Sequence, residues 1–286
     1  MPRRDGRSQY TGRACAVAGL CMAGCHATGS PWPERNSIHR HDAVWELYHI
    51  TGSFYDWLID KQHQIIPPRS WLLVPPGMSH GERGAALAPG RLHWFHFDRH
   101  PAALLSDDQR DHTRLAERFT AAAGTIIAAA STAEPLLDAV IAGLAGGDDG
   151  LRTIRVQTAL RQVLLAWLDD AGGRRPAALD PLRRVAATID SNPADDWTVD
   201  QLARRHGVNP STFTDAFAAV IGLTPVAYRS CRRVIAAKQL LETGTSPIAT
   251  IATRLGYATA QHFATVFARH TGLSPSAWRR RFQGGD

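Results

Sequence analysis

The C-terminal third of the chain contains an internal repeat with a period of fifty residues. Gly-Leu-Thr-Pro-Val-Ala-Tyr-Arg at 222–229 recurs as Gly-Leu-Ser-Pro-Ser-Ala-Trp-Arg at 272–279. A repeat at this spacing indicates two copies of one supersecondary unit. Each copy has the pattern helix, glycine-containing turn, helix, which is typical of a helix-turn-helix motif that places its second helix in a DNA major groove. The repeat therefore predicts a helical domain with two recognition helices.

The positive charge of the chain lies in the same region. The formal net charge is +6; residues 181–286 hold 13 Lys or Arg against 7 Asp or Glu, whereas residues 1–180 hold 19 of each. Almost all of these cations are arginines, whose planar fork suits bidentate contacts with phosphate and guanine. The same excess is also compatible with an ordinary solvated surface, so the charge supports a DNA partner without proving it.

Length and composition favour a globular chain with two domains. The 286 residues suffice for two cores, and 44% are hydrophobic and 20% charged. No apolar stretch approaches the length of a membrane span, so no membrane partner is expected. Four cysteines, Cys15, Cys21, Cys25 and Cys231, are too few for a disulfide framework and indicate a reducing, cytoplasmic location.

Residues 1–34 are predicted to be a disordered tail. Arg3, Arg4 and Arg7 before the weakly apolar stretch 14–25 imitate a signal peptide, but that stretch is short and rich in Gly and Cys. An alternative is a translation start at Met22. The pair Cys21 and Cys25 lacks the second ligand pair that a structural zinc site requires.

Residues 35–171 are predicted to form the first folded domain. Short alternating runs at 45–50, 53–59, 64–66, 71–74 and 92–97 predict strands of a small sandwich or barrel, separated by Gly and Pro turns. From residue 106 to about 171 the apolar spacing becomes helical. The Gly- and Pro-containing stretch 172–180 is the expected linker to a second domain at 181–282.

Helix-capping residues place the elements of the repeat. Thr198 and Gln201 form a capping box, and Asn209 before Pro210 starts the first recognition helix. In the second copy Gly256 supplies the turn and Thr259 caps the second recognition helix. A long helix from Thr224-Pro225 to Leu241, with Val226 and Val234 on its core side, joins the copies. It would hold the two recognition helices so that they enter successive major grooves roughly 34 Å apart.

Periodicity predicts which side chains of the recognition helices face outward. The phenylalanines at 213, 217, 263 and 267 face inward, which leaves the polar and small residues between them exposed. The candidates for contact with bases are Ser211, Thr212, Thr214 and Asp215 in the first copy and Ala260, Gln261, His262 and Thr265 in the second.

Residues 181–282 resemble the DNA-binding domain of the AraC/XylS family of bacterial transcription regulators. The resemblance is carried by the run 256–279, which is similar to the family signature across nearly its whole length. The front of the chain resembles the cupin-like sensing domain of that family in Pro-Pro-Gly-Met-Ser-His at 75–80 and Trp-Phe-His-Phe at 94–97. The resemblance implies an α+β chain, with a cupin-like β-barrel and flanking helices before an all-α domain that holds two helix-turn-helix motifs.

Two positions depart from the family pattern. Asp215 and Thr265 stand where the family usually carries Arg or Lys late on the exposed face of each recognition helix. An aspartate repels phosphate, and a threonine has a short reach. Phosphate contacts are therefore assigned to the arginines of the domain, namely Arg204, Arg205, Arg229, Arg232, Arg233, Arg269 and Arg279.

The front barrel is expected to bind a small-molecule effector rather than a cofactor. The candidate lining residues are Tyr48, Trp57, Trp71, His80, Trp94 and His96. His39, His41, Glu46 and His80 imitate the ligand set of metal-binding cupins, and an enzyme of that class fused to a DNA-binding domain is the alternative function. Because His39 and His41 precede the first strand and His80 closes a tight turn, we expect no metal. The sequence has no Gly-rich phosphate loop, no Gly-x-Ser-x-Gly elbow and no His-Glu-x-x-His motif, so we expect no catalysis.

The sequence therefore predicts a cytoplasmic, nucleoid-associated transcription regulator. Its expected partners are double-stranded DNA, a small-molecule effector, RNA polymerase and a second copy of the chain, with helices in 106–171 as the dimer surface. A DNA-repair methyl acceptor with similar helix pairs would need a reactive thiol. Cys231 lies inside the joining helix and is expected to be packed.

Overall fold

The chain divides into two compact units in the computed structural model, with the boundary near residues 175–176. The structure describes residues 6–29, 37–82, 89–130, 132–173, 180–205, 207 and 209–283. No helix within these ranges is both long enough and apolar enough to cross a membrane. Most of the predicted linker 172–180 lies outside the described residues.

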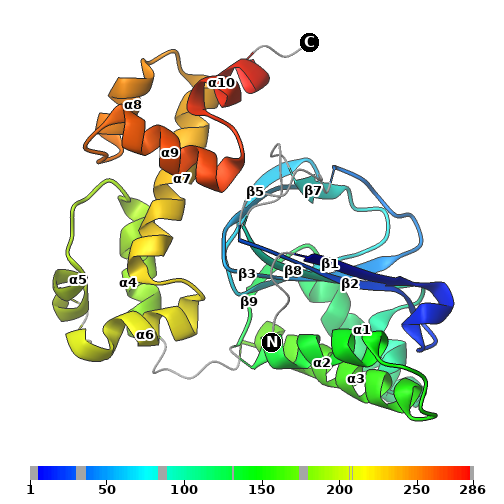
Figure 1. Cartoon of the computed structure of the whole chain (residues 1–286). Helices are drawn as coiled ribbons and strands as arrows, with labels where there is room; N and C mark the ends of the chain where they lie inside the picture. The colour runs from blue at the N-terminus through cyan, green and yellow to red at the C-terminus, as the bar shows by residue number, and fades with distance from the viewer. Residues whose placement is uncertain are drawn as a thin grey trace. The chain divides into compact units, whose positions relative to one another are not determined.

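The front unit consists of two antiparallel sheets that face each other (Figure 1). The larger sheet has the strand order β1-β2-β8-β3-β6-β9, and the smaller one has the order β5-β4-β7. The strands are β1 (Gly6–Thr11), β2 (Leu20–Thr28), β3 (Trp45–Thr51), β4 (Tyr55–Ile59), β5 (Gln62–Ile66), β6 (Ser70–Val74), β7 (His80–Glu82), β8 (Gly90–Phe97) and β9 (Ile126–Ala128). The predicted sandwich or barrel is present, and all five predicted strands are among these.

Three helices cover the outer face of the larger sheet (Figure 1). They are α1 (Gln109–Ala122), α2 (Ala133–Ala145) and α3 (Arg152–Ala171), with two 3₁₀ turns at Gly12–Cys15 and Pro101–Leu104. Fully buried side chains of these helices, such as Leu137, Val163 and Trp167, share one apolar core with Leu47 and Phe95 of the sheet. Strand β9 interrupts the stretch predicted as helical and pairs with β6.

The prediction of a disordered tail over residues 1–34 is wrong for residues 6–29. They form β1 and β2, which pair with each other, and β2 also pairs with β8 along the larger sheet. The sequence did not predict β2 because several of its residues are small and have low strand propensity. At Gly24 the structure requires a residue without a side chain, since a Cβ there would lie 2.2 Å from the indole of Trp94. Pairing with β8 outweighs the weak intrinsic preference of Gly, Ala and Cys for strands.

The second unit is all helical, as predicted (Figure 1). Its helices are α4 (Asp180–Ser191), α5 (Val199–Arg205), α6 (Pro210–Ile221), α7 (Pro225–Thr243), α8 (Ile248–Arg254), α9 (Ala260–Thr271) and α10 (Pro275–Gln283). Helix α7 joins a first group, α4 to α6, to a second group, α8 to α10. At about 1.5 Å per residue, the 19 residues of α7 span about 28 Å.

The caps of these helices follow the predicted residues. Thr198 and Gln201 exchange hydrogen bonds at 2.9 and 3.1 Å before α5. Thr259 accepts from the backbone N–H of His262 at 3.1 Å, and Thr224 accepts from that of Ala227 at 3.3 Å. One expectation fails: Val226 is 56% exposed and not on the core side of α7. It lies two residues before the buried Tyr228, which places it on nearly the opposite side of a helix with 3.6 residues per turn.

Candidate nucleic-acid interface and barrel interior

The two recognition helices, α6 and α9, bury the same pair of aromatic side chains. Phe213 and Phe217 of α6 and Phe263 and Phe267 of α9 have no exposed surface. Each buried phenylalanine contributes about 3–5 kcal/mol relative to alanine. This burial fixes the rotation of each helix about its axis and determines which residues face outward.

The outward faces carry most of the predicted base-contact residues. Thr212 and Asp215 on α6, and Gln261, His262 and Thr265 on α9, are exposed. Thr214 and Ala260 are partly buried, and the side chain of Ser211 lies outside the described residues. The Thr265 hydroxyl already donates to the Gln261 carbonyl at 3.0 Å, which leaves Gln261 and His262 as the longer polar groups on α9.

The loop before α9 brings backbone and side chains together tightly. Gly256 has φ +74°, and a Cβ at this position would lie 2.7 Å from the carbonyl oxygen of Ala194. The Tyr257 ring packs edge-on against His262, with ring centroids 5.7 Å apart. This contact orients the His262 ring at the start of α9.

The predicted phosphate-contacting arginines separate into two groups. Arg204, Arg205 and Arg269 are exposed. The other four bind groups of the protein itself. Arg232 forms a 2.7 Å ion pair with Asp190, and Arg233 donates to the carbonyls of Pro193, Ala194 and Gly256 at 2.8–3.3 Å.

Arg229 and Arg279 occupy equivalent positions in the two copies and make equivalent hydrogen bonds to the backbone. Arg229 donates to the Trp197 carbonyl at 2.9 Å, just before α5, and Arg279 donates to the Ser246 carbonyl at 2.6 Å, just before α8. Each arginine thus holds the loop that leads into the first helix of its own motif. Arg229, Arg232, Arg233 and Arg279 thus use some of their N–H groups on acceptors of the protein itself, and their assignment as phosphate clamps stays a prediction.

Comparison with known proteins identifies this unit. A family model described as a helix-turn-helix domain matches residues 202–281. The regulator AlkR of Acinetobacter baylyi is 33% identical over 118 residues, which cover 41% of this chain and 39% of AlkR. A putative AraC-like transcription regulator of Streptomyces antibioticus is 33% identical over 114 residues, covering 39% of this chain and 37% of that protein. Residues 202–281 form a helix-turn-helix domain that is similar to part of these regulators, and we call it the AraC-type domain.

The chain spans less than two fifths of the length of these curated relatives, so the match describes the AraC-type domain and not the whole protein. Among solved structures, the DNA-binding domain of AdpA in complex with a target DNA is 29% identical, with a TM-score of 0.35, over 36% of this chain and 94% of that chain. ToxT of Vibrio cholerae O395 aligns over 98% of this chain and 99% of its own at 12% identity and a TM-score of 0.38.

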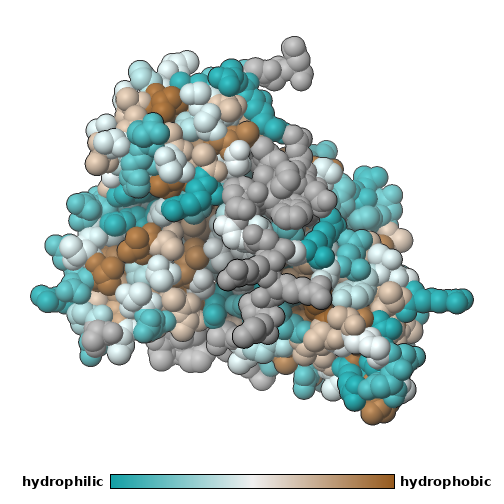
Figure 2. All heavy atoms as spheres, viewed as in Figure 1, coloured by the Kyte–Doolittle hydropathy of each residue, from teal (hydrophilic) through white to brown (hydrophobic). Residues whose placement is uncertain are grey.

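Three exposed arginines of the AraC-type domain were not among the sequence candidates. Arg254 ends α8, directly before the turn to the recognition helix, and Arg280 and Arg281 lie on α10. Arg254 could have been predicted from the repeat, because it ends α8 just as Arg205, which was a candidate, ends α5 in the first copy. In Figure 2 the visible described residues of this unit are mainly hydrophilic or neutral, with hydrophobic ones dispersed among them.

In the front unit, the barrel interior collects polar side chains from both sheets. Glu46 and Tyr48 of β3 face the interior together with His96 of β8, which pairs with Glu46 in register. His80 enters from β7 of the smaller sheet, and its backbone exchanges hydrogen bonds of 2.9 Å with His39 in both directions. All of these except His39 are buried.

A single oxygen of Glu46 is the centre of this cluster. It accepts from the Tyr48 hydroxyl at 2.6 Å and lies 3.1 Å from His96 Nε2, 3.2 Å from His80 Nε2 and 3.9 Å from His39 Nε2. Burial opposes ionisation of this carboxyl group, but the hydrogen bonds from His39, His80 and His96 hold the pKa of Glu46 well below its ordinary value. The cluster therefore contains an ionised carboxylate.

Five of the six predicted effector-lining residues surround this cluster or lie on the same sheet face. Trp57 packs against Tyr48 with centroids 5.0 Å apart and donates to Glu82 at 2.9 Å, and Trp94 pairs with Tyr48 in register. Trp71 is the exception. It pairs with His49 on the opposite face, belongs to the core under the helices and donates to Asp170 of α3 at 3.0 Å, so it does not line the interior.

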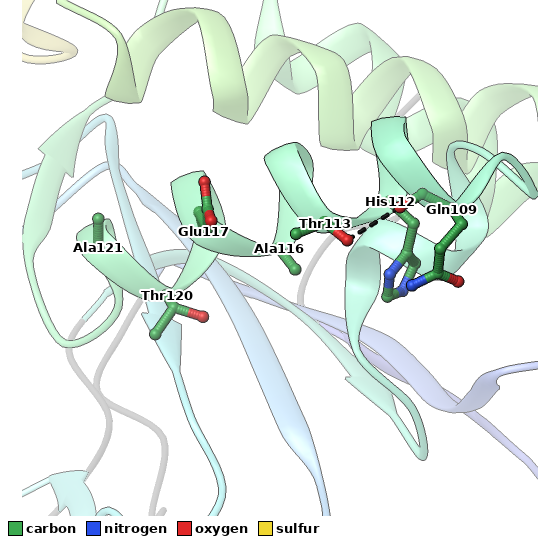
Figure 3. Close-up of a pocket in the computed structure, with 7 residues that line it drawn as sticks. All are labelled: Gln109, His112, Thr113, Ala116, Glu117, Thr120 and Ala121. Atoms are coloured by element: carbon green, nitrogen blue, oxygen red, sulfur yellow. Dashed lines mark hydrogen bonds between the residues drawn. The ribbon is translucent and has the colours of Figure 1, made fainter.

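A different hollow lies on the outside of the front unit, along α1 (Figure 3). A single helix supplies all of its lining residues, so it is an open groove on a helix surface. They are Gln109, His112, Thr113, Ala116, Glu117, Thr120 and Ala121. This surface shares no residue with the cluster around Glu46.

Proposed function

We propose that this protein is a sequence-specific DNA-binding transcription regulator. The observation that carries the proposal is the duplicated recognition helix: α6 and α9 both bury two phenylalanines and expose polar faces in an AraC-type domain. Gln261 and His262 are the main candidates for base recognition, because their longer polar side chains can reach base edges. The other proposed base contacts are Ser211, Thr212, Thr214, Asp215, Ala260 and Thr265. Arg204, Arg205, Arg254 and Arg269 supply the phosphate contacts.

Because the proposed partner is DNA, we infer a location in the bacterial cytoplasm, at the nucleoid. Some relatives are activators by name, such as the virulence regulon transcriptional activator VirF of Yersinia enterocolitica, 32% identical over 99 residues. Contact with RNA polymerase is accordingly part of the proposal. AlkR, VirF and the Streptomyces antibioticus protein are all named as regulators or activators, which gives no support to an enzyme fused to a DNA-binding domain.

The front unit is proposed to control DNA binding through a ligand held in the barrel interior. A ligand changes DNA affinity only if it binds two arrangements of the protein with different affinity. Tyr48, Trp57, His80, Trp94 and His96 are the interior residues for such a ligand. Because they are all buried, an organic effector would need to displace them, whereas a small ion would not.

Helix α3 is the proposed dimer surface. Its outer face exposes Ile154 and Leu165, at 60% and 50%, with Leu151 at 49% just before the helix. Exposed apolar side chains on one helix face are typical of contact with a partner. Sedimentation of the full chain at micromolar concentration should show a dimer that Ile154→Glu together with Leu165→Glu dissociates; a wild-type monomer would remove this part of the proposal.

The DNA-binding proposal is tested with the full chain and random-sequence duplexes. We expect binding near 50 mM salt, enrichment of a common sequence on repeated selection, and a linear fall of log K with log salt concentration. The double variant Arg254→Ala, Arg269→Ala should bind at least about tenfold more weakly with a shallower salt slope. The matched control is Arg110→Ala, Arg114→Ala on the exposed face of α1. Absence of binding, or equal loss in the control, would refute the proposal.

A further inference from the structure

The cluster around Glu46 has the composition and spacing of a metal site. Two sets of three side chains, His39 with Glu46 and His80, and His41 with Glu46 and His96, each bring their ligand atoms within 4.8 Å of one another. Glu46 belongs to both sets. Imidazole nitrogen and carboxylate oxygen are common ligands of divalent transition metals.

The hydrogen bonds of two histidines leave their Nε2 atoms as the ligating atoms. His39 Nδ1 lies 2.7 Å from the Ser37 carbonyl, and His80 Nδ1 lies 3.2 Å from the Met78 carbonyl. A carbonyl only accepts, so each Nδ1 carries a proton, and Nε2, which lies toward the Glu46 oxygen, is the ring nitrogen that can become a metal ligand. Backbone carbonyls that hold the far nitrogen in this way are typical of metal-bound histidines.

A single cation could contact all three groups at once. The Nε2 atoms of His39 and His80 lie 3.9 and 3.2 Å from the same Glu46 oxygen, and their rings lie 4.4 Å apart between centroids. The side chains of His80 and Glu46 have 0% and 1% exposed surface, so an ion between them would be largely shielded from water. Such an ion would offset the buried negative charge of Glu46 and take both nitrogens and the carboxylate oxygen as ligands.

The distances accommodate such an ion with little movement. Bonds of about 2.0–2.2 Å at tetrahedral or octahedral angles separate neighbouring ligand atoms by about 3.0–3.5 Å. The observed separations from the Glu46 oxygen are 3.2 Å for His80, which is within this range, and 3.9 Å for His39, which must move closer by about 0.4 Å or more. The His39 side chain is 29% exposed, which gives the ion a route from solvent.

We propose that His39, Glu46 and His80 bind a divalent transition-metal ion in the barrel, next to His41 and His96, which form the second set of three with Glu46. The Tyr48 hydroxyl holds the carboxylate in place. Because Glu46 belongs to the larger sheet and His80 to the smaller one, the ion joins the two sheets. The nitrogen ligands favour zinc, iron or nickel over magnesium and calcium, which prefer oxygen. The inference concerns the front unit and does not depend on DNA binding.

Metal content of the full chain, purified without a histidine tag and without chelator, tests the proposal. We expect about one transition-metal ion per chain, and restoration of that content by Zn²⁺ or Co²⁺ after chelation. The thermal midpoint should fall on chelation and recover with Zn²⁺ but not with Mg²⁺ or Ca²⁺. Co²⁺ should give a visible d–d spectrum from a site with nitrogen ligands.

Two variants and one control make the test specific. His39→Ala removes a partly exposed ligand without a cavity in the core, and Glu46→Gln keeps the shape of the shared ligand without its charge. Each should weaken Zn²⁺ binding at least about tenfold. His112→Ala, on the α1 groove, should bind like the wild type. Metal content below about 0.2 per chain, or equal affinity in wild type and His39→Ala, would overturn the proposal whatever the DNA-binding result.

Discussion

At the scale of single residues, Gln261 carries the strongest expectation of base recognition. It is exposed on α9, beside a His262 ring that packs on Tyr257, and its amide can donate to and accept from an adenine edge. Gln261→Ala should cost about 1–3 kcal/mol on the selected sequence and relax preference at one base pair. Competition binding with single-base variants of the duplex measures this. Gln109→Ala, an exposed glutamine on α1, is the control and should change nothing; unchanged selectivity in Gln261→Ala would remove the assignment.

Asp215 makes the two recognition helices unequal. Its exposed carboxylate lies on α6, where a cation would attract phosphate. Asp215→Arg should therefore tighten binding to selected and random duplexes alike and steepen the salt dependence by about one phosphate contact. Salt titrations on both duplexes measure this, with Asp107→Arg before α1 as the control. A gain confined to one sequence would instead indicate that residue 215 contacts a base.

At the scale of elements, β2 shows why a strand can be missed when it is predicted from local sequence alone. Its small residues have little strand propensity, and the reason for one of them, the indole of Trp94 over Gly24, lies seventy positions away along the chain. By contrast, the helices of the repeat were predictable because their signals are local: caps at Thr198 and Thr259, and phenylalanines at helical spacing. The side-chain partners of Arg229 and Arg279 were not predictable, since a surface arginine and a loop-holding arginine look alike in sequence.

The packing of β2 can be tested by adding one methyl group. Gly24→Ala should destabilise the front unit by about 1–3 kcal/mol through overpacking against Trp94. Gly6→Ala is the matched control, because a Cβ at Gly6 would meet nothing within 4 Å. Thermal unfolding followed by tryptophan fluorescence compares the two. Equal midpoints would mean that residues 20–28 do not pack as a strand against β8.

At the scale of the whole molecule, the two units contribute separate chemistry. The AraC-type domain supplies exposed polar faces on two helices with their own apolar core, and the front unit supplies a buried carboxylate surrounded by histidines. The repeat predicted the first, because duplication is visible in the sequence. The second was only partly visible: His39, His41, Glu46 and His80 were noticed, but their convergence with His96 depends on the pairing of β3 with β8 and of residue 39 with β7.

The central claim is that α6 and α9 both enter the major groove of one duplex, held apart by α7. Methylation protection of guanine N7 by the full chain on a selected duplex tests it most directly, since N7 faces the major groove. We predict two protected clusters about 10–10.5 base pairs apart, of which the cluster read by α9 disappears in Gln261→Ala with His262→Ala. A single continuous protected segment, or guanine N7 atoms that stay unprotected in the bound duplex, would contradict the account.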